Sequence, residues 1–215
     1  MTATSTPLPF STEALLQAIP GIAYVVDRDG DILAFSRGPF MEDVKIPGGT
    51  ASGYRHAIGS SLFSIIQGEQ VRQSYRRMHK AVWFGRADAF GFAYRCDAPE
   101  VERNMFMSIS QIAEGSETAA VLYQSVVVSE LRRPPLPLFA FEGLGEQAPP
   151  AERIVTLCSY CQKVAWPVRA AERPEWIEAV EFYRRGGRTD AVVSHGICEI
   201  CLEQIAERCT TGTDD

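Results

Sequence analysis

The chain has 215 residues, 46% of them hydrophobic, which is enough for one medium core or for a core with a small appendage. Its formal net charge of −6 opposes general binding to nucleic acid, which requires a basic face. No run approaches the roughly 18 apolar residues of a membrane span, and the first residues lack the basic and apolar regions of a secretory signal. We therefore expect a cytoplasmic protein with neither membrane nor nucleic-acid partners.

The first expected elements are a flexible stretch, residues 1–10, and a short helix. Ser11 is a suitable N-cap for this helix, and Pro20 with Gly21 ends it. Residues 22–36 then form two strands around the turn signal Asp29-Gly30. After an irregular stretch at 37–57, residues 69–85 form an amphipathic helix, because apolar side chains recur there at helical spacing.

Three strands are expected between residues 88 and 130. Alternation places Phe90, Phe92 and Tyr94 on one face of the first strand. It places Met105 and Met107 on one face of the second strand, and the third is apolar on both sides near its end. The chain is therefore predicted to be an α+β protein.

This order of elements resembles a PAS domain over about residues 11–130. The stretches "LLQAIPGIAYVVDRDGDILAFS" and "GSSLFSII" are similar to the opening of PAS domains and to the turn before their long helix. The resemblance implies a five-stranded antiparallel sheet with flanking helices, in a sensory or dimerisation module. It also implies that the inner face of the sheet can enclose a small-molecule ligand and that the chain forms a homodimer through this domain.

A ligand pocket in such a domain would use the long helix and the last strands. Haem-binding PAS domains use a histidine on the long helix, and His79 lies there, although a position at the solvent edge is the simpler interpretation. The N-C-R-F-L-Q run of flavin-binding members is absent. The pocket candidates are Phe92, Tyr94, Arg95, Arg103, Met105, Met107 and His79.

Charged residues bracket a turn at Pro99 between two of these strands. Arg95, Asp97 and Arg103 would form either a cationic recess for an anionic ligand or a hairpin held by an Arg–Asp pair. The ion-paired hairpin is the simpler interpretation.

The composition changes near residue 131. Residues 131–152 are rich in proline and predict a semi-rigid linker, although "LPLFAF" is too apolar for a free tether and should dock on a neighbouring element. A second unit, residues 153–209, follows and is too small to fold without a stabilising metal ion or cross-link. Residues 210–215 are expected to be flexible.

Two C-x2-C pairs, Cys158 with Cys161 and Cys198 with Cys201, lie near the two ends of this second unit. In a reducing compartment such pairs favour one tetrahedral zinc site. A turn would present the first pair and the start of a helix the second, as in a treble-clef-like module. Four thiolates leave no open coordination position, which predicts a structural ion. A redox dithiol is the alternative, but Pro167 prevents the helix that follows such a dithiol.

The segments "LCSYCQKV" and "SHGICEICLEQ" resemble the cysteine-rich tail that follows PAS or receiver domains in bacterial signalling proteins. Gln162 departs from that pattern, which has a lysine there. His195 precedes the second pair and would orient the turn, or replace one cysteine as a ligand. The matching residues are Cys158, Tyr160, Cys161, Lys163, Ser194, His195, Gly196, Ile197, Cys198 and Cys201.

Together these patterns predict a non-enzymatic bacterial signalling protein. A PAS-like sensor would be coupled to a structural four-cysteine zinc module that contacts a partner protein. The alternative is a thiol-based redox sensor in which oxidation of the C-x2-C pairs releases zinc. No convincing nucleophile–base set supports an enzyme.

Overall fold

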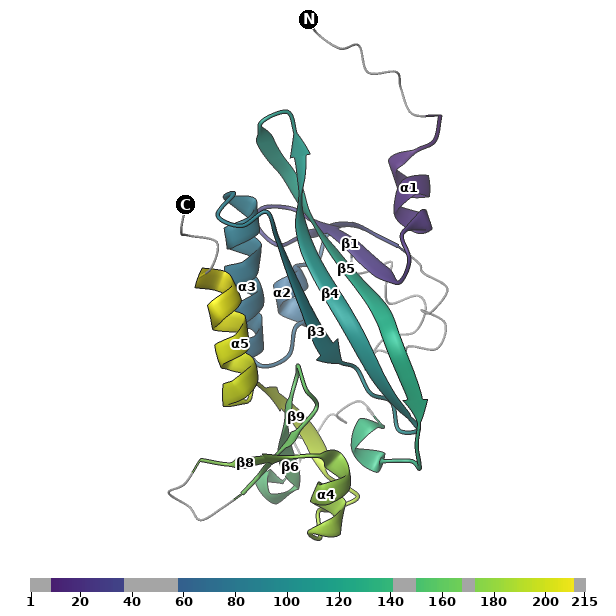
Figure 1. Ribbon diagram of the computed structural model, residues 1–215, viewed down its shortest axis with the longest axis vertical. Coiled ribbons are helices and arrows are strands. Elements are labelled where there is room, and N and C mark those ends of the chain that lie inside the picture. The colour runs from purple at the N-terminus through teal and green to yellow at the C-terminus, as the bar shows by residue number, and fades with distance from the viewer. Residues whose placement is uncertain (1–8, 37–57, 141–149, 168–172, 211–215) are drawn as a thin grey trace, which may run out of the picture.

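The computed structural model describes residues 9–36, 58–140, 150–167 and 173–210 (Figure 1). These residues form a five-stranded sheet, a four-stranded sheet and flanking helices. The predicted irregular stretch at 37–57, most of the predicted flexible N-terminus and the end of the predicted flexible C-terminus lie outside the described residues. Within the described residues, no helix combines the length and the apolarity needed to cross a bilayer.

The predicted N-terminal helix and hairpin are confirmed. The helix α1 (Thr12–Ala18) begins after Ser11, whose hydroxyl accepts a hydrogen bond from the Ala14 amide. In the hairpin of β1 (Ile22–Val26) and β2 (Ile32–Phe35), the Asp27 carboxylate accepts hydrogen bonds from the three turn amides of residues 29–31, at 2.8–3.0 Å. The hydrogen bonds to Asp27 therefore fix the turn that joins β1 to β2 at this edge of the sheet.

The five-stranded sheet is antiparallel throughout, with the strand order β2-β1-β5-β4-β3. Its longer strands are β3 (Ala89–Arg95), β4 (Val101–Glu114) and β5 (Glu117–Arg132). Phe92 pairs with Met107, and Tyr94 pairs with Met105, so the predicted apolar rows share one face. The predicted five-stranded antiparallel sheet of an α+β fold is thereby confirmed.

The long helix α3 (Glu69–Trp83) follows the short α2 (Leu62–Ile65), and α3 lies beside the sheet (Figure 1). Val71, Met78 and Val82 are buried in a cluster that includes sheet residues such as Ile109 and Tyr123. The predicted helical spacing of apolar residues is therefore the face that covers the sheet.

The second part of the chain contains the four-stranded sheet, with the order β8-β7-β6-β9 and a parallel β6–β9 pair. Leu138 and Phe139 are buried here with Leu157 and Phe182, which confirms that the apolar piece of the proline-rich segment docks. The elements are η2 (Pro137–Phe139), η3 (Ala151–Arg153), β6 (Ile154–Cys158), β7 (Val164–Trp166), β8 (Glu175–Ile177), α4 (Ala179–Arg184), β9 (Val192–Gly196) and α5 (Glu199–Thr210).

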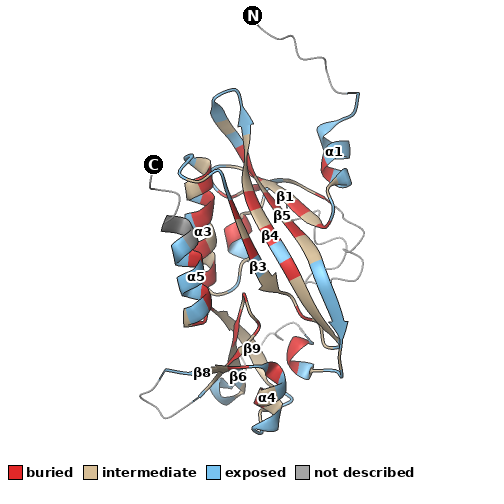
Figure 2. Cartoon of the chain, viewed as in Figure 1, coloured by how far each residue is buried: buried red, intermediate tan, exposed pale blue. Residues whose placement is uncertain are grey.

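One buried cluster contains residues from both predicted units, although the division at residues 131–152 itself stays a prediction. Tyr160, Ile197 and Ile205 belong to the same cluster as Phe92 and the buried face of α3. The helices α3 and α5 lie side by side (Figure 1), and both contribute buried residues to this cluster (Figure 2). The second unit therefore completes the core of the first.

Gly68, which caps α3, marks how closely the two parts approach. Its φ is +83°, and a Cβ at this position would lie 2.5 Å from the carbonyl oxygen of His195 in β9. Because real Cβ atoms do not approach backbone oxygen so closely, glycine is required both by the backbone conformation and by the contact.

Candidate metal centre

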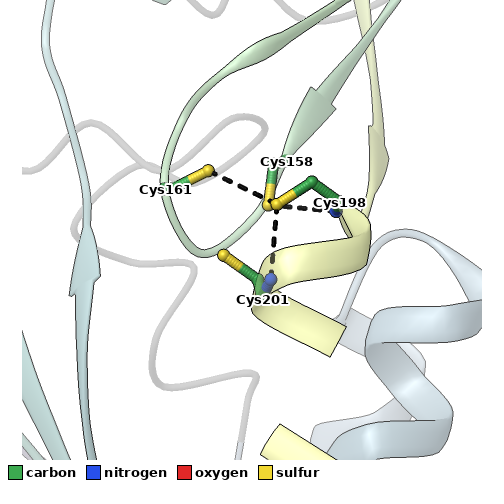
Figure 3. A group of neighbouring side chains, drawn as sticks. All are labelled: Cys158, Cys161, Cys198 and Cys201. Atoms are coloured by element: carbon green, nitrogen blue, oxygen red, sulfur yellow. Dashed lines mark hydrogen bonds between the residues drawn. The ribbon is translucent and has the colours of Figure 1, made fainter. Parts of the chain in front are cut away.

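The first cysteine pair lies on a tight turn between β6 and β7. Cys158 ends β6, and its amide donates to the Lys163 carbonyl at 2.8 Å. The Gln162 amide donates back to the Cys158 carbonyl at 2.9 Å, and Gln162 adopts a left-handed φ of 61°. This conformation folds the chain back after Cys161, so both sulfurs of the pair lie on the same side of the turn (Figure 3).

The second pair lies where α5 begins. Cys198 precedes the first helical residue, and its Sγ accepts a hydrogen bond from the Cys201 amide at 3.4 Å, as an N-cap would. The Cys198 amide donates to Sγ of Cys158, also at 3.4 Å. The free amides at the helix start therefore face the sulfurs and favour negative charge there.

Strand pairing brings the two pairs together. In the parallel β6–β9 ladder, Cys158 is opposite Gly196, two residues before Cys198. The first turn of α5 therefore begins beside the β6–β7 turn, as Figure 3 shows. A long-range ladder, rather than local sequence, positions the second pair.

The four sulfurs converge on one point (Figure 3). All four Sγ atoms lie within 4.8 Å of one another, and those of Cys161 and Cys198 are 3.8 Å apart. A tetrahedral ion with metal–sulfur bonds of about 2.3 Å holds its sulfurs about 3.8 Å apart. Cys158, Cys198 and Cys201 are buried and Cys161 is half-buried. The donor set, its spacing and its burial therefore fit a four-thiolate metal centre.

The electrostatics of the cluster also fit a cation. Hydrogen bonds from Cys161 and Cys201 and from the Cys198 amide lower the pKa of Cys158 well below that of a free thiol. A thiolate at Cys158 then raises the pKa of Cys161 and of Cys201. Protein groups alone thus stabilise one negative charge, whereas four thiolates require a cation between them.

His195 lies in β9 next to the cluster but outside the four-cysteine group. Its Nδ1 atom is 3.4 Å from the Ser159 hydroxyl, in the turn of the first pair. Burial lowers the pKa of His195, which favours the neutral ring. This position matches the predicted orienting role better than that of a ligand.

The predicted pocket residues do not all meet. Tyr94, Arg103 and Met105 line a cavity of about 550 Å³, together with Cys96, Ser125 and Glu130. Phe92 and Met107 are buried in the core cluster instead. Within the cavity, Tyr94 and Ser125 share a hydrogen bond between their hydroxyls. The cavity lining therefore combines apolar side chains with hydroxyl groups and charged groups.

The charged hairpin is an ion-pair network. Asp97 has no exposed side-chain surface and pairs with Arg95 and with Arg133, the latter at 2.8 Å. Arg95 also reaches Glu178, and Arg103 pairs with Glu130 at 2.6 Å. The interpretation as a hairpin held by an Arg–Asp pair is confirmed, and carboxylates offset the positive charges of the proposed recess. Sequence reasoning missed Arg133, because it lies far from the hairpin along the chain.

The expectation that His79 lies at the solvent edge is wrong, because its side chain is 1% exposed. Its Nδ1 is 3.0 Å from the Tyr123 hydroxyl, and the two rings stack with an interplanar angle of 12°. Burial lowers the pKa of His79 and raises that of Tyr123, so a neutral imidazole and a neutral phenol share this hydrogen bond. A hydrogen-bond partner inside the core is what allows this histidine to be buried.

We expect stability to fall as the pH decreases from about 7 to 5. The pKa values of His79 and His195 are lowered in the folded state, so the unfolded state takes up protons first, near the ordinary histidine pKa of about 6.5. Urea unfolding across this range would measure the slope. In His79→Gln, whose amide can still form a hydrogen bond with Tyr123, the slope should be shallower, and an equal slope would contradict the assignment.

No protein-family model matches the chain, and no curated protein matches it. Among solved structures, a C-terminal domain from Streptococcus mutans is similar over 58% of this chain and 93% of its own, at 11% identity and a TM-score of 0.45. The PAS domain of BvgS from Bordetella pertussis is similar over 54% of this chain and 83% of its own, at 12% identity and a TM-score of 0.42. At these values, neither likeness bears on what the chain does.

Proposed function

We propose that the chain is a non-enzymatic signalling protein in which a PAS-like sensor domain is joined to a structural zinc centre. The observation that carries this proposal is the convergence of four cysteine sulfurs within 4.8 Å of one another. Cys158, Cys161, Cys198 and Cys201 would hold the ion. When bound, zinc would supply structural stability rather than chemistry, since four thiolates leave no position for water or substrate.

The sensor half of the proposal rests on the antiparallel sheet and on the cavity beside it. The strand order β2-β1-β5-β4-β3 with a long helix on one face agrees with the architecture that the PAS resemblance implies. The cavity lined by Tyr94 and Met105 has the size and the mixed lining of a small-molecule site. We propose that this domain binds a small ligand or pairs with a second copy, and that the treble-clef-like module contacts a partner protein.

Metal analysis tests the proposal. Native mass spectrometry of the purified protein should find one zinc ion per chain, because one group of four thiolates provides one tetrahedral site. The zinc should be lost on acidification, since the ligands must be deprotonated. A chain that stays free of metal when supplied with Zn2+ under reducing conditions would contradict the proposal.

A redox sensor is the second candidate, and one observation favours it. Cys161 is half-buried while the other three cysteines are buried, so an oxidant would reach one thiolate first. In that case low concentrations of peroxide should release zinc in step with thiol loss. Zinc retained during thiol loss elsewhere in the chain would exclude this candidate.

A further inference from the structure

We propose that Tyr160 couples the cysteine centre to the core of the five-stranded unit, so that metal occupancy controls how tightly α3 and β3 are held. The proposal rests on the metal centre proposed above and deepens it. Tyr160 lies between Cys158 and Cys161, on the turn that a metal would fix. Its side chain is 5% exposed and belongs to the same buried cluster as the inner face of the sheet.

Tyr160 reaches α3 through its hydroxyl. The Tyr160 hydroxyl and the Ser74 hydroxyl lie 2.8 Å apart in a buried hydrogen bond, and Ser74 also donates to the Val71 carbonyl at 2.8 Å. A buried hydroxyl that loses its partner destabilises the state in which it is buried, because no water replaces the lost bond. Since the Ser74 hydrogen is used on Val71, the Tyr160 hydroxyl donates to Ser74, and displacement of the cysteine turn would leave the buried Tyr160 hydroxyl without this partner.

Tyr160 reaches β3 through both its ring and its backbone. The ring centroid is 5.5 Å from that of Phe92, and the Tyr160 carbonyl accepts the amide hydrogen of Arg95 at 2.7 Å. β3 is an edge strand, so within the described residues its outer side has no neighbouring strand to accept hydrogen bonds from its amides. The Tyr160 carbonyl is the acceptor for the Arg95 amide on that side. A single residue of the turn thus contacts the helix and the strand of the first unit.

The same strand leads to the cavity. Tyr94 and Cys96 flank Arg95, and both line the cavity of about 550 Å³. A turn loosened by metal loss would remove the partner of the Arg95 amide and leave this end of β3, with the cavity wall at Tyr94 and Cys96, held by β4 and by the ion pairs of Arg95. Coupling between two sites is reciprocal, so anything that loosens this wall should also weaken metal binding.

The experiment compares two variants that each lose one tyrosine hydroxyl. Tyr160→Phe removes the bond to Ser74, whereas Tyr183→Phe removes the bond from the Leu138 amide, in the second buried cluster. We would measure the affinity for Zn2+ in each full chain by competition with a chelator. We would also measure hydrogen exchange of residues 69–83 and 89–95 with and without zinc.

The expected result is that Tyr160→Phe binds Zn2+ roughly five- to tenfold more weakly, the effect of one buried hydrogen bond, while Tyr183→Phe binds it as the wild type does. Zinc removal should speed exchange in α3 and β3 of the wild type. Ser74→Ala breaks the same bond from the helix side and replaces Tyr160→Phe if that variant does not fold. Unchanged zinc affinity in the folded variant, or exchange in α3 that is unaffected by zinc, overturns the coupling alone. A wild-type chain that takes up no zinc overturns the proposed function as well.

Discussion

Replacing Cys158 with serine is expected to remove tight zinc binding and to lower the free energy of unfolding by at least about 4 kcal/mol. Structural zinc in small domains contributes an apparent binding energy on the order of 10 kcal/mol, all of it folding energy. Cys158 is fully buried and lies in the cluster shared by both parts of the chain, so the loss should reach beyond the turn. Urea unfolding and zinc content, measured on one preparation, check this result.

Cys96→Ser is the matched control for the cysteine prediction. Cys96 lies outside the four-cysteine group, and burial raises the pKa of its thiol, so it should remain an unreactive lining residue. Its replacement should leave the zinc content unchanged and alter stability by about 1 kcal/mol or less. If both variants lose equally little stability, the centre contributes no folding energy and the structural role is wrong.

Asp97→Asn is expected to cost roughly 3–5 kcal/mol of stability, the range found when one partner of a buried ion pair is removed. The Asp97 side chain is inaccessible to solvent and accepts hydrogen bonds from Arg95 and Arg133, whose own side chains are 16% and 13% exposed. Asparagine keeps the shape but leaves two poorly hydrated guanidinium groups without their buried anion. The midpoint of denaturant unfolding measures the loss.

Asp190→Asn provides the comparison for this ion pair. Asp190 bonds to Arg188 at 2.8 Å, but its side chain is 49% exposed, so water screens the pair and the expected loss is much smaller than in Asp97→Asn. Similar losses in the two variants would mean that burial at Asp97 does not strengthen its pairs.

Sequence patterns predicted the parts of the fold that local chemistry determines. The turn at Asp29-Gly30, the spacing of α3 and the alternation of Phe92 and Tyr94 each depend on neighbours within a few residues. The grouping of the four cysteines was also predictable, because paired thiols with this spacing have few other uses in a reducing compartment.

What the sequence could not reveal depends on contacts between distant segments. His79 is buried because Tyr123, which is 44 residues away, supplies a hydrogen bond. The sequence assigned Tyr160 only to the cysteine motif, yet its side chain meets Ser74, which is 86 residues away. Periodicity indicates that a face is buried but not what covers it, so the shared core could not be predicted.

The parallel β6–β9 ladder has a consequence for how the chain acquires its structure. The two strands are separated in the chain by β7, β8 and α4, so β6 cannot pair with β9 until this whole connection has been synthesised. Contacts that close long loops form slowly, because the chain loses conformational entropy before the favourable energy of the contacts is gained. During synthesis on the ribosome, the second cysteine pair emerges long after β3 and α3. We therefore expect the inner face of the five-stranded sheet to remain incompletely covered until translation has passed Cys201.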